Sequence, residues 1–426
     1  MPNRIRVALI TTLTIISSLM VAAPAGAAVT PQKVVIIVGP TGALTDNYRS
    51  KGDSIALTAE AAGATVVKVY SPNATWANVK AAVTGANIVI YLGHGNGFPN
   101  PYGTTELTDR HNGWGLNRTT TNGDGDNWSS TMVYCGEKVL RGLLTSSDDS
   151  ARLNYCGGTA NDGIAPASNW VMIYSNACYA PGAGEGSDPQ GPATEAKAFE
   201  RVRNYSFPGL SVGAGAYFAT DMHNGAQQLV DTILRNPGMA FGAIAENANG
   251  YDLSDQRHFA HPDLAGKRIW IQNTGTPTSG NYFFAYAGEP GLTPSGTTVA
   301  YTEPVFQPPL AASYSASPPS AWFAGQTQTY AVTLTNTGTQ TWNAGGSNPV
   351  RLGVSFGTGN DTAGVGWATD QRFSLPGDLA PGASVTLSLS VTAPSGTGSY
   401  VLRQRMVKEG LVWFDQLQKS NVTVAA

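Results

Sequence analysis

The sequence predicts an α/β domain built on a mostly parallel sheet, with helices on both faces, followed by a smaller all-β domain. Continuous Val, Ile and Leu runs separated by helical patterns occupy roughly the first two thirds of the chain. Runs of alternating polarity fill the last quarter, and a Pro- and Ser-rich stretch lies between the two. A length of 426 residues, 42% hydrophobic, also fits two or three domains with a large core.

The composition excludes several classes of protein. Only 12% of residues are charged, and 25 Lys and Arg against 28 Asp and Glu give a net charge of −3. This balance provides no strong field for attracting nucleic acid or anionic lipid, so we expect neither as a partner. With 50 Gly and 26 Pro, the sequence favours short strands and tight turns and excludes a coiled coil.

The first 27 residues have the pattern of a secretory signal peptide. Arg4 and Arg6 precede an uncharged, largely apolar run over 7–23, which ends in the small residues Ala25-Gly26-Ala27. A short membrane anchor is the alternative, but the run contains several Thr and Ser and leads directly into the cleavage motif. We therefore expect a secreted protein that has no membrane contact after removal of residues 1–27.

The α/β domain is predicted over residues 28–288. Its first half alternates strand and helix: strand 33–40, helix 46–63, strand 64–71, helix 75–86 and strand 87–95. Residues 96–168 are too irregular for a simple connection and indicate an inserted region. The second half continues with strand 169–178, helix 194–204, strand 209–220, helix 223–236 and an antiparallel hairpin over 267–275 and 281–288.

The three cysteines fall into two environments. Cys135 and Cys156 lie in the polar, Gly- and Ser-rich insertion, where a disulfide closing about 20 residues would contribute roughly 3 kcal/mol. A secreted chain tends to pair its thiols, so we predict this bridge and a free Cys178. Cys178 ends an apolar run, and two interpretations remain open: a small core residue or a reactive thiol.

Residues 289–316 have the composition of an extended linker, and residues 317–426 alternate apolar and polar residues as the strands of a β-sandwich do. This last region contains neither His nor Cys, so no catalytic cluster is expected there. It resembles the four-tryptophan immunoglobulin-like domain through Trp322, Trp342, Trp367 and Trp413. The resemblance implies a sandwich, and we expect it to bind a protein, a glycan or a cell surface.

Reactive side chains follow two strands of the α/β domain. His94-Gly95 comes after the third predicted strand, and Ala177-Cys178 ends the fourth. Open parallel sheets bind ligands outside the carboxyl ends of their strands. If these two strands are neighbours, the imidazole and the thiol emerge at one edge of the sheet.

An apolar block followed by His-Gly, and a later one followed by Ala-Cys, resembles the caspase, gingipain, clostripain and legumain group of cysteine peptidases. The resemblance implies that Cys178 attacks the scissile carbonyl and that His94 transfers the proton. It also implies that the backbone N–H groups of Gly95 and Cys178 stabilise the oxyanion. Ser175-Asn176-Ala177 departs from the caspase Gln-Ala-Cys arrangement, so a preference for Asp is not implied.

The loop after Cys178 shapes the primary substrate pocket in that group. Here it contains Glu185 and Asp188, which we list as candidate partners of a substrate Arg or Lys; solvated turn carboxylates are the alternative. The function predicted from these residues is a secreted cysteine endopeptidase acting on protein or peptide. The alternative from another class is an exported binding protein whose α/β domain is inactive.

A serine esterase is the rival enzyme. Gly209–Gly213 matches the G-x-S-x-G elbow with Ser211 as nucleophile. The elbow needs a strand before the serine and a helix after it, whereas Pro208 precedes the motif and a strand-like run follows. We therefore place Ser211 within a strand and favour the cysteine peptidase.

Two sequence patterns resemble metal sites, but they are weaker than the His94 and Cys178 pattern, and no cofactor is expected. Asp124 and Asp126 are spaced like the first half of a calcium loop, but Asn127 stands where such a loop has Gly, so we favour a polar turn over structural calcium. His258 and His261, with Asp263 nearby, have no further ligand motif, and we interpret them as surface histidines.

Overall fold

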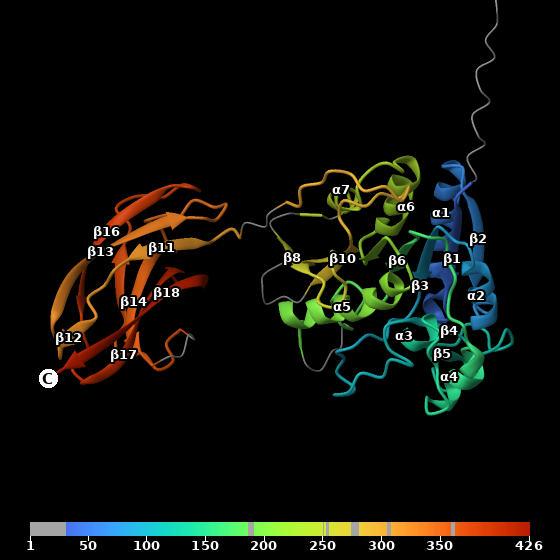
Figure 1. Ribbon diagram of the computed structural model, residues 1–426, viewed down its shortest axis with the longest axis horizontal. Coiled ribbons are helices and arrows are strands. Elements are labelled where there is room, and N and C mark those ends of the chain that lie inside the picture. The colour runs from blue at the N-terminus through green and yellow to red at the C-terminus, as the bar shows by residue number, and fades with distance from the viewer. Residues whose placement is uncertain are drawn as a thin grey trace, which may run out of the picture.

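The structure is a computed structural model. It describes residues 31–185, 191–249, 251–252, 255–273, 281–304, 308–358 and 363–426. The expected signal peptide over 1–27 and the candidate residue Asp188 lie outside these ranges. Two units are present, an α/β unit and a β unit, shown in Figure 1. None of the helices within the described ranges has the length and apolar character needed to cross a membrane.

A large mixed sheet forms the α/β unit, as the sequence predicts at this level. Eight strands lie in the order β2-β1-β3-β6-β7-β10-β9-β8, of which the first five are parallel and the last three antiparallel. The strands are β1 Lys33–Val38, β2 Thr65–Tyr70, β3 Ile88–Leu92, β6 Val171–Ser175, β7 Ala216–Thr220, β8 Gln256–Ala260, β9 Arg268–Asn273 and β10 Tyr282–Gly288.

Both faces of this sheet are covered, because its central strands are apolar on both sides. In β1, Val35 and Ile37 enter one core and Val34 and Ile36 the other. The second core is closed by α1 Thr45–Ala61, α6 Gly225–Arg235 and α7 Phe241–Glu246, which lie together in Figure 1. The first core is closed by α2 Trp76–Val83, α5 Glu195–Ser211 and the insertion between β3 and β6.

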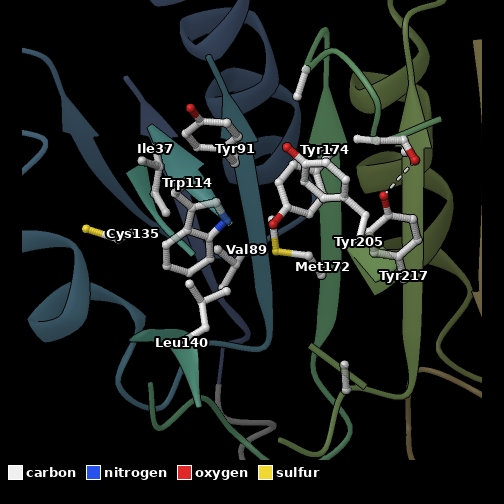
Figure 2. Close-up of a cluster of buried hydrophobic side chains, with 14 of the residues drawn as sticks. Ile37, Val89, Tyr91, Trp114, Cys135, Leu140, Met172, Tyr174, Tyr205 and Tyr217 are labelled. Carbon is white, nitrogen blue, oxygen red and sulfur yellow. Dashed lines mark hydrogen bonds between the residues drawn. The ribbon is translucent and has the colours of Figure 1, made fainter. Parts of the chain in front are cut away.

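The insertion has its own small framework. It contains the antiparallel pair β4 Trp114–Asn117 and β5 Met132–Cys135, with α3 Glu137–Leu140 and α4 Ser150–Tyr155. Cys135 and Cys156 are bonded to each other, which confirms the predicted disulfide, and Cys178 is free. The buried Trp114 ring lies 6.5 Å from that of Tyr91 on β3, so the insertion packs directly on the sheet (Figure 2).

The prediction of a strand over 209–220 is wrong in its first half. Helix α5 continues through Pro208 to Ser211, and β7 begins only at Ala216. Burial of Tyr205 and Leu210 against the sheet stabilises this last turn in spite of the proline. Ser211 therefore follows a helix and precedes a strand, the reverse of a nucleophile elbow, and the esterase hypothesis fails.

His258 and His261 are not surface residues, which corrects their interpretation. The His258 ring lies on β8 and stacks on Trp270 at 4.1 Å, while the His261 side chain is fully buried and its Nδ1 accepts the Asp263 N–H at 3.2 Å. Pairing of β8 with β9 places His258 opposite Trp270, and the His261 ring lies 6.5 Å from that of Phe207 on α5. The described residues contain no group of three His, Cys, Asp or Glu placed to hold a metal.

The segment expected as a linker is only partly one. Tyr301 packs against the α/β core and donates to Glu246 at 2.5 Å, and Glu303 accepts from Trp270 Nε1 at 2.6 Å. At the other end, β11 already begins at Ala312 in the β unit. Apolar and aromatic residues within the Pro-rich stretch explain this, since composition alone does not reveal which of them find a packing surface.

The β unit consists of two sheets with a common core. One contains β11 Ala312–Ala316, β13 Thr327–Asn336 and β16 Ser384–Thr392; the other contains β12 Ala321–Phe323, β18 Val412–Ala425, β17 Gly398–Lys408, β14 Val350–Gly357 and β15 Gln371–Ser374. Trp322 and Trp342 are buried in the core between them. Trp367 and Trp413 are half-buried and pack edge to face at 5.3 Å.

Candidate functional site

The site lies where β3 and β6 end. The two strands are parallel neighbours, with Leu92 opposite Ser175, so the segments that follow them leave the same edge of the sheet. The backbones of Gly95 and Cys178 are in direct contact: a Cβ on Gly95 would lie 2.7 Å from both the carbonyl carbon and the amide nitrogen of Cys178. The structure therefore brings the two predicted strand ends together.

Cys178 is a free, half-buried thiol. It packs against the core between the sheet and α5. Burial raises the pKa of this thiol to about 11, and the charges of Asp221 and Glu185 act in the same direction. At neutral pH the sulfur is protonated and needs a base before it can act as a nucleophile.

His94 can be that base. Burial lowers the pKa of its imidazole, and the opposing effect of the Asp126 and Glu185 carboxylates is smaller. The imidazole is therefore neutral at neutral pH and able to accept a proton. Its Nε2 lies 3.8 Å from Asp126 Oδ2, and no hydrogen bond joins it to Cys178 in this structure.

The backbone around the thiol is strained. Asn176 and Tyr179 have φ values of 55° and 70°, in the left-handed region that costs a non-glycine residue roughly 1 kcal/mol or more. Two hydrogen bonds hold these conformations: Asn176 N–H to the Thr220 carbonyl at 3.1 Å and Tyr179 N–H to the Ala183 carbonyl at 2.8 Å. Strain maintained on both sides of one side chain is typical of a functional segment.

Buried tyrosines lie close to one another in the core next to the two segments; Figure 2 labels Tyr91, Tyr174, Tyr205 and Tyr217. The Tyr91 hydroxyl donates to the His94 carbonyl at 2.8 Å, and the Tyr205 hydroxyl accepts the Asn96 N–H at 2.8 Å. The Tyr217 hydroxyl donates to the Ala180 carbonyl at 2.8 Å. These hydroxyls fix the backbone on both sides of the site.

Gly95 and Cys178 are the residues expected to donate backbone N–H groups to an oxyanion. Among the described residues, no backbone carbonyl accepts the N–H groups of Gly95 and Cys178, and the Cys178 N–H interacts with its own thiol. Backbone N–H groups beside a nucleophile are the type of donor that stabilises a developing oxyanion.

Glu185 belongs to the site but is already hydrogen-bonded. Tyr102 donates to its Oε2 at 2.7 Å, and Tyr179 donates to its Oε1 at 3.2 Å. Its charge still acts on both His94 and Cys178. Glu185 therefore lies beside the predicted pair, with each oxygen also engaged by a phenol.

Sequence reasoning missed three residues of the site. Tyr48 and Lys51 on α1 donate to Asn176, at 3.3 Å to its carbonyl and 2.8 Å to its side-chain oxygen. Asp221 directly follows β7, and burial raises the pKa of its carboxyl to about 7. The strand-end rule that indicated His94 applies equally to Asp221, because β7 is the next parallel strand after β6.

The calcium-like turn is anchored by protein groups. The Asp124 carboxylate accepts hydrogen bonds from Arg49 and from Ser71, the latter at 2.9 Å, and its carbonyl accepts the Gly42 N–H at 2.7 Å. Asp124 thus attaches the turn to α1 and to the segments that follow β1 and β2. Asp126 extends from the same turn toward His94.

Comparisons with known proteins assign no family to the chain. No family model and no curated protein matches it. Among solved structures, the CARDB domain of a Pyrococcus furiosus protein is 17% identical over 27% of this chain and 94% of its own, with a TM-score of 0.20. A β-glucosidase from Erythrobacter marinus is 13% identical over 93% of this chain and 47% of its own, with a TM-score of 0.21. Similarities this low carry no argument about fold or function.

Proposed function

We propose that this protein is a secreted cysteine endopeptidase, with Cys178 as nucleophile and His94 as general base and acid. The observation that carries the proposal is the contact between the segments after β3 and β6, which puts a free thiol and a neutral imidazole at one sheet edge. The proposal includes a scaffold of the caspase, gingipain, clostripain and legumain type. His94-Gly95 and Ala177-Cys178 resemble the motifs of that group.

The proposed reaction begins with the protonated thiol. His94 takes the Cys178 proton as the sulfur forms a bond to the scissile carbonyl carbon, and the oxyanion is held by the N–H groups of Gly95 and Cys178. The C–N bond then breaks and the imidazolium gives its proton to the leaving amine. Water, deprotonated by His94, attacks the thioester, and the acid product leaves as the thiol is restored.

The electrostatics fit this order of events. Because the pKa of Cys178 is raised and that of His94 is lowered, a resting thiolate–imidazolium pair is disfavoured. Proton transfer has to accompany attack, as in general-base catalysis. Glu185, the substrate-binding residue expected from the sequence, would attract a substrate Arg or Lys by its charge while its oxygens stay bonded to the two phenols.

Secretion and the role of the β unit are part of the same proposal. A disulfide between Cys135 and Cys156 is the state expected in an oxidising compartment. The two β-sheets and the four tryptophans support an immunoglobulin-like sandwich. We propose that it binds a protein, glycan or cell-surface ligand and so keeps the peptidase near its substrate.

A second candidate is an exported binding protein without activity. The observation in its favour is the raised pKa of Cys178 together with the missing hydrogen bond to His94. Such a thiol would be a small residue of the loop, as the sequence also allows.

Digestion of a peptide library with the mature protein and its Cys178→Ala variant separates the two. The peptidase predicts cleavage that the substitution reduces by a factor of at least about 1000, with folding unchanged by circular dichroism. The exported binding protein predicts no cleavage by either form. Cleavage that survives the substitution would contradict the proposal, and Ser211→Ala serves as a control that leaves cleavage unchanged.

A further inference from the structure

A carboxylate from the insertion reaches the imidazole of the candidate site. Asp126 Oδ2 lies 3.8 Å from His94 Nε2, about 1 Å beyond a charge-assisted hydrogen bond. The His94 Nε2 atom is shielded from solvent and has no hydrogen-bond partner among the described residues. A shielded, unpaired ring nitrogen facing a carboxylate indicates a missing partner.

The position of Asp126 is set by the turn that carries it. Asp124 attaches this turn to Arg49 on α1, to Ser71 after β2 and to the Gly42 N–H after β1. A Cβ on Gly42 would lie 3.0 Å from Asp126 Oδ2, so the carboxylate, 57% exposed, lies against Gly42 on one side and faces His94 on the other. Gly42 has a φ of 58°, a conformation that favours glycine, and the absence of a Cβ leaves room for the carboxylate.

We propose that Asp126 is a positioning residue for His94: its carboxylate accepts the Nε2 proton, which orients the ring and leaves Nδ1 to exchange a proton with Cys178. This inference rests on the proposed peptidase function. It gives the Asn122–Asp126 turn a purpose that is different from metal binding. In this proposal, Asp124 fixes the position of the turn and Asp126 extends from it to His94.

The other charged and titratable groups around His94 are few. Glu185 raises the pKa of the imidazole from the loop after Cys178, and Cys178 is the proposed proton donor. Tyr134 on β5 is influenced by the charges of Cys178, Glu185 and Asp126 and stays protonated, because burial raises its pKa. Glu185 is engaged by two tyrosines, which leaves Asp126 as the carboxylate directed at the ring.

The first test is the pH profile of kcat/KM on the peptide that the wild type cleaves best. We expect Asp126→Asn to lower kcat/KM by about tenfold or more. It should also move the acid limb to lower pH, because the lost negative charge favoured protonated His94. Asp126→Glu should restore part of both, and Asp231→Asn, which removes an exposed carboxylate paired with Arg235 on α6, should change neither.

A second measurement does not depend on activity. The His94 imidazole is titrated by NMR in full-length mature Cys178→Ala protein, with and without Asp126→Asn. A lower His94 pKa in the Asn variant supports the inference, and an unchanged value overturns it, whether or not any peptide is cleaved. If Asp126→Asn lowers kcat/KM but leaves the acid limb of the pH profile in place, the inference is also overturned. A variant that only disturbs the turn would give this result. Absence of Cys178-dependent cleavage contradicts the proposed function separately.

Discussion

The α/β unit and the β unit both bury apolar side chains against sheets, but with different strand topologies. Only the topology of the α/β unit brings reactive side chains together at one edge of a sheet. In the large sheet, five consecutive strands run parallel, so His94, Cys178 and Asp221 all follow strands that end at one edge. In the β unit, neighbouring strands mostly run antiparallel, and successive strand ends lie at opposite edges. Parallel topology collects loops from distant parts of the chain, and antiparallel topology separates them.

Polar groups are also used differently in the two units. On the exposed face of β13 and β16, hydroxyls pair across the strands, as Thr333 does with Thr386 at 2.8 Å and Thr335 with Ser384 at 2.7 Å. In the α/β unit, buried tyrosine hydroxyls instead hold loop backbone near the thiol. Similar hydrogen bonds therefore support a sheet in one unit and position a site in the other.

Among the predictions that compare the two units, the largest expected effect comes from adding one methyl group at the contact between the two strand ends. Gly95→Ala places a Cβ against the Cys178 backbone, and we expect peptide cleavage to fall by about 100-fold or more. Gly377→Ala in the β unit is the control, because nothing lies within 4 Å of its Cβ. Cleavage kinetics and thermal unfolding are measured for both variants. Equal cleavage by Gly95→Ala and Gly377→Ala would contradict the special role of the contact between the two strand ends.

Reduction of the disulfide should affect one unit only. Replacing Cys135 and Cys156 by Ala should lower the stability of the α/β unit by about 3 kcal/mol, since the bridge spans 21 residues. The β unit has no cysteine, so its unfolding transition should stay in place. Calorimetry with and without reductant tests this, and a matching shift of both transitions would show that the units do not unfold separately.

Two tyrosines with equivalent hydrogen bonds, the buried Tyr91 and the half-buried Tyr314, allow a matched comparison. The Tyr91 hydroxyl accepts the Gly115 N–H at 2.9 Å and donates to His94, while that of Tyr314 accepts the Met406 N–H at 2.8 Å and donates to Gln416 at 3.0 Å. Each Phe substitution should cost about 1–3 kcal/mol in chemical denaturation.

Only Tyr91→Phe should also lower kcat/KM, because only Tyr91 holds the backbone of the proposed base. A loss of activity in Tyr314→Phe of the same size would mean that general stability, and not loop position, determines the rate.

The smallest expected effect is on thiol reactivity. Asp221 raises the pKa of Cys178, so Asp221→Asn should increase the thiolate fraction and speed alkylation by iodoacetamide at pH 8, roughly two- to fivefold. Below about pH 7 the wild-type carboxyl is itself protonated, and the difference should fade. Mass spectrometry of alkylated Cys178 gives the rates, with Asp378→Asn in the β unit as the control. A slower variant at pH 8 would contradict this electrostatic account.

Strand and helix types were predictable where apolar runs were long. The runs over 33–40, 87–95 and 169–178 each became buried parallel strands, since nothing but a central position in a covered sheet accommodates such sequences. The prediction failed at 209–220, where Gly, Ser and Ala are compatible with several conformations. In the structure, burial of Leu210 against the sheet stabilises the helical conformation of residues 209–211.

By itself, the sequence determined an α/β chain, a second β unit, a Cys135–Cys156 bridge and a free Cys178 at the end of an apolar run. Local hydrophobic pattern and cysteine environment are enough for these, because they depend on residues close in the chain. Only the tertiary structure decided that Asp126 lies beside the imidazole and Asp221 near the thiol, and that the side chains of His258 and His261 are buried. Those placements depend on strand order and on how a long insertion folds back, which no local pattern encodes.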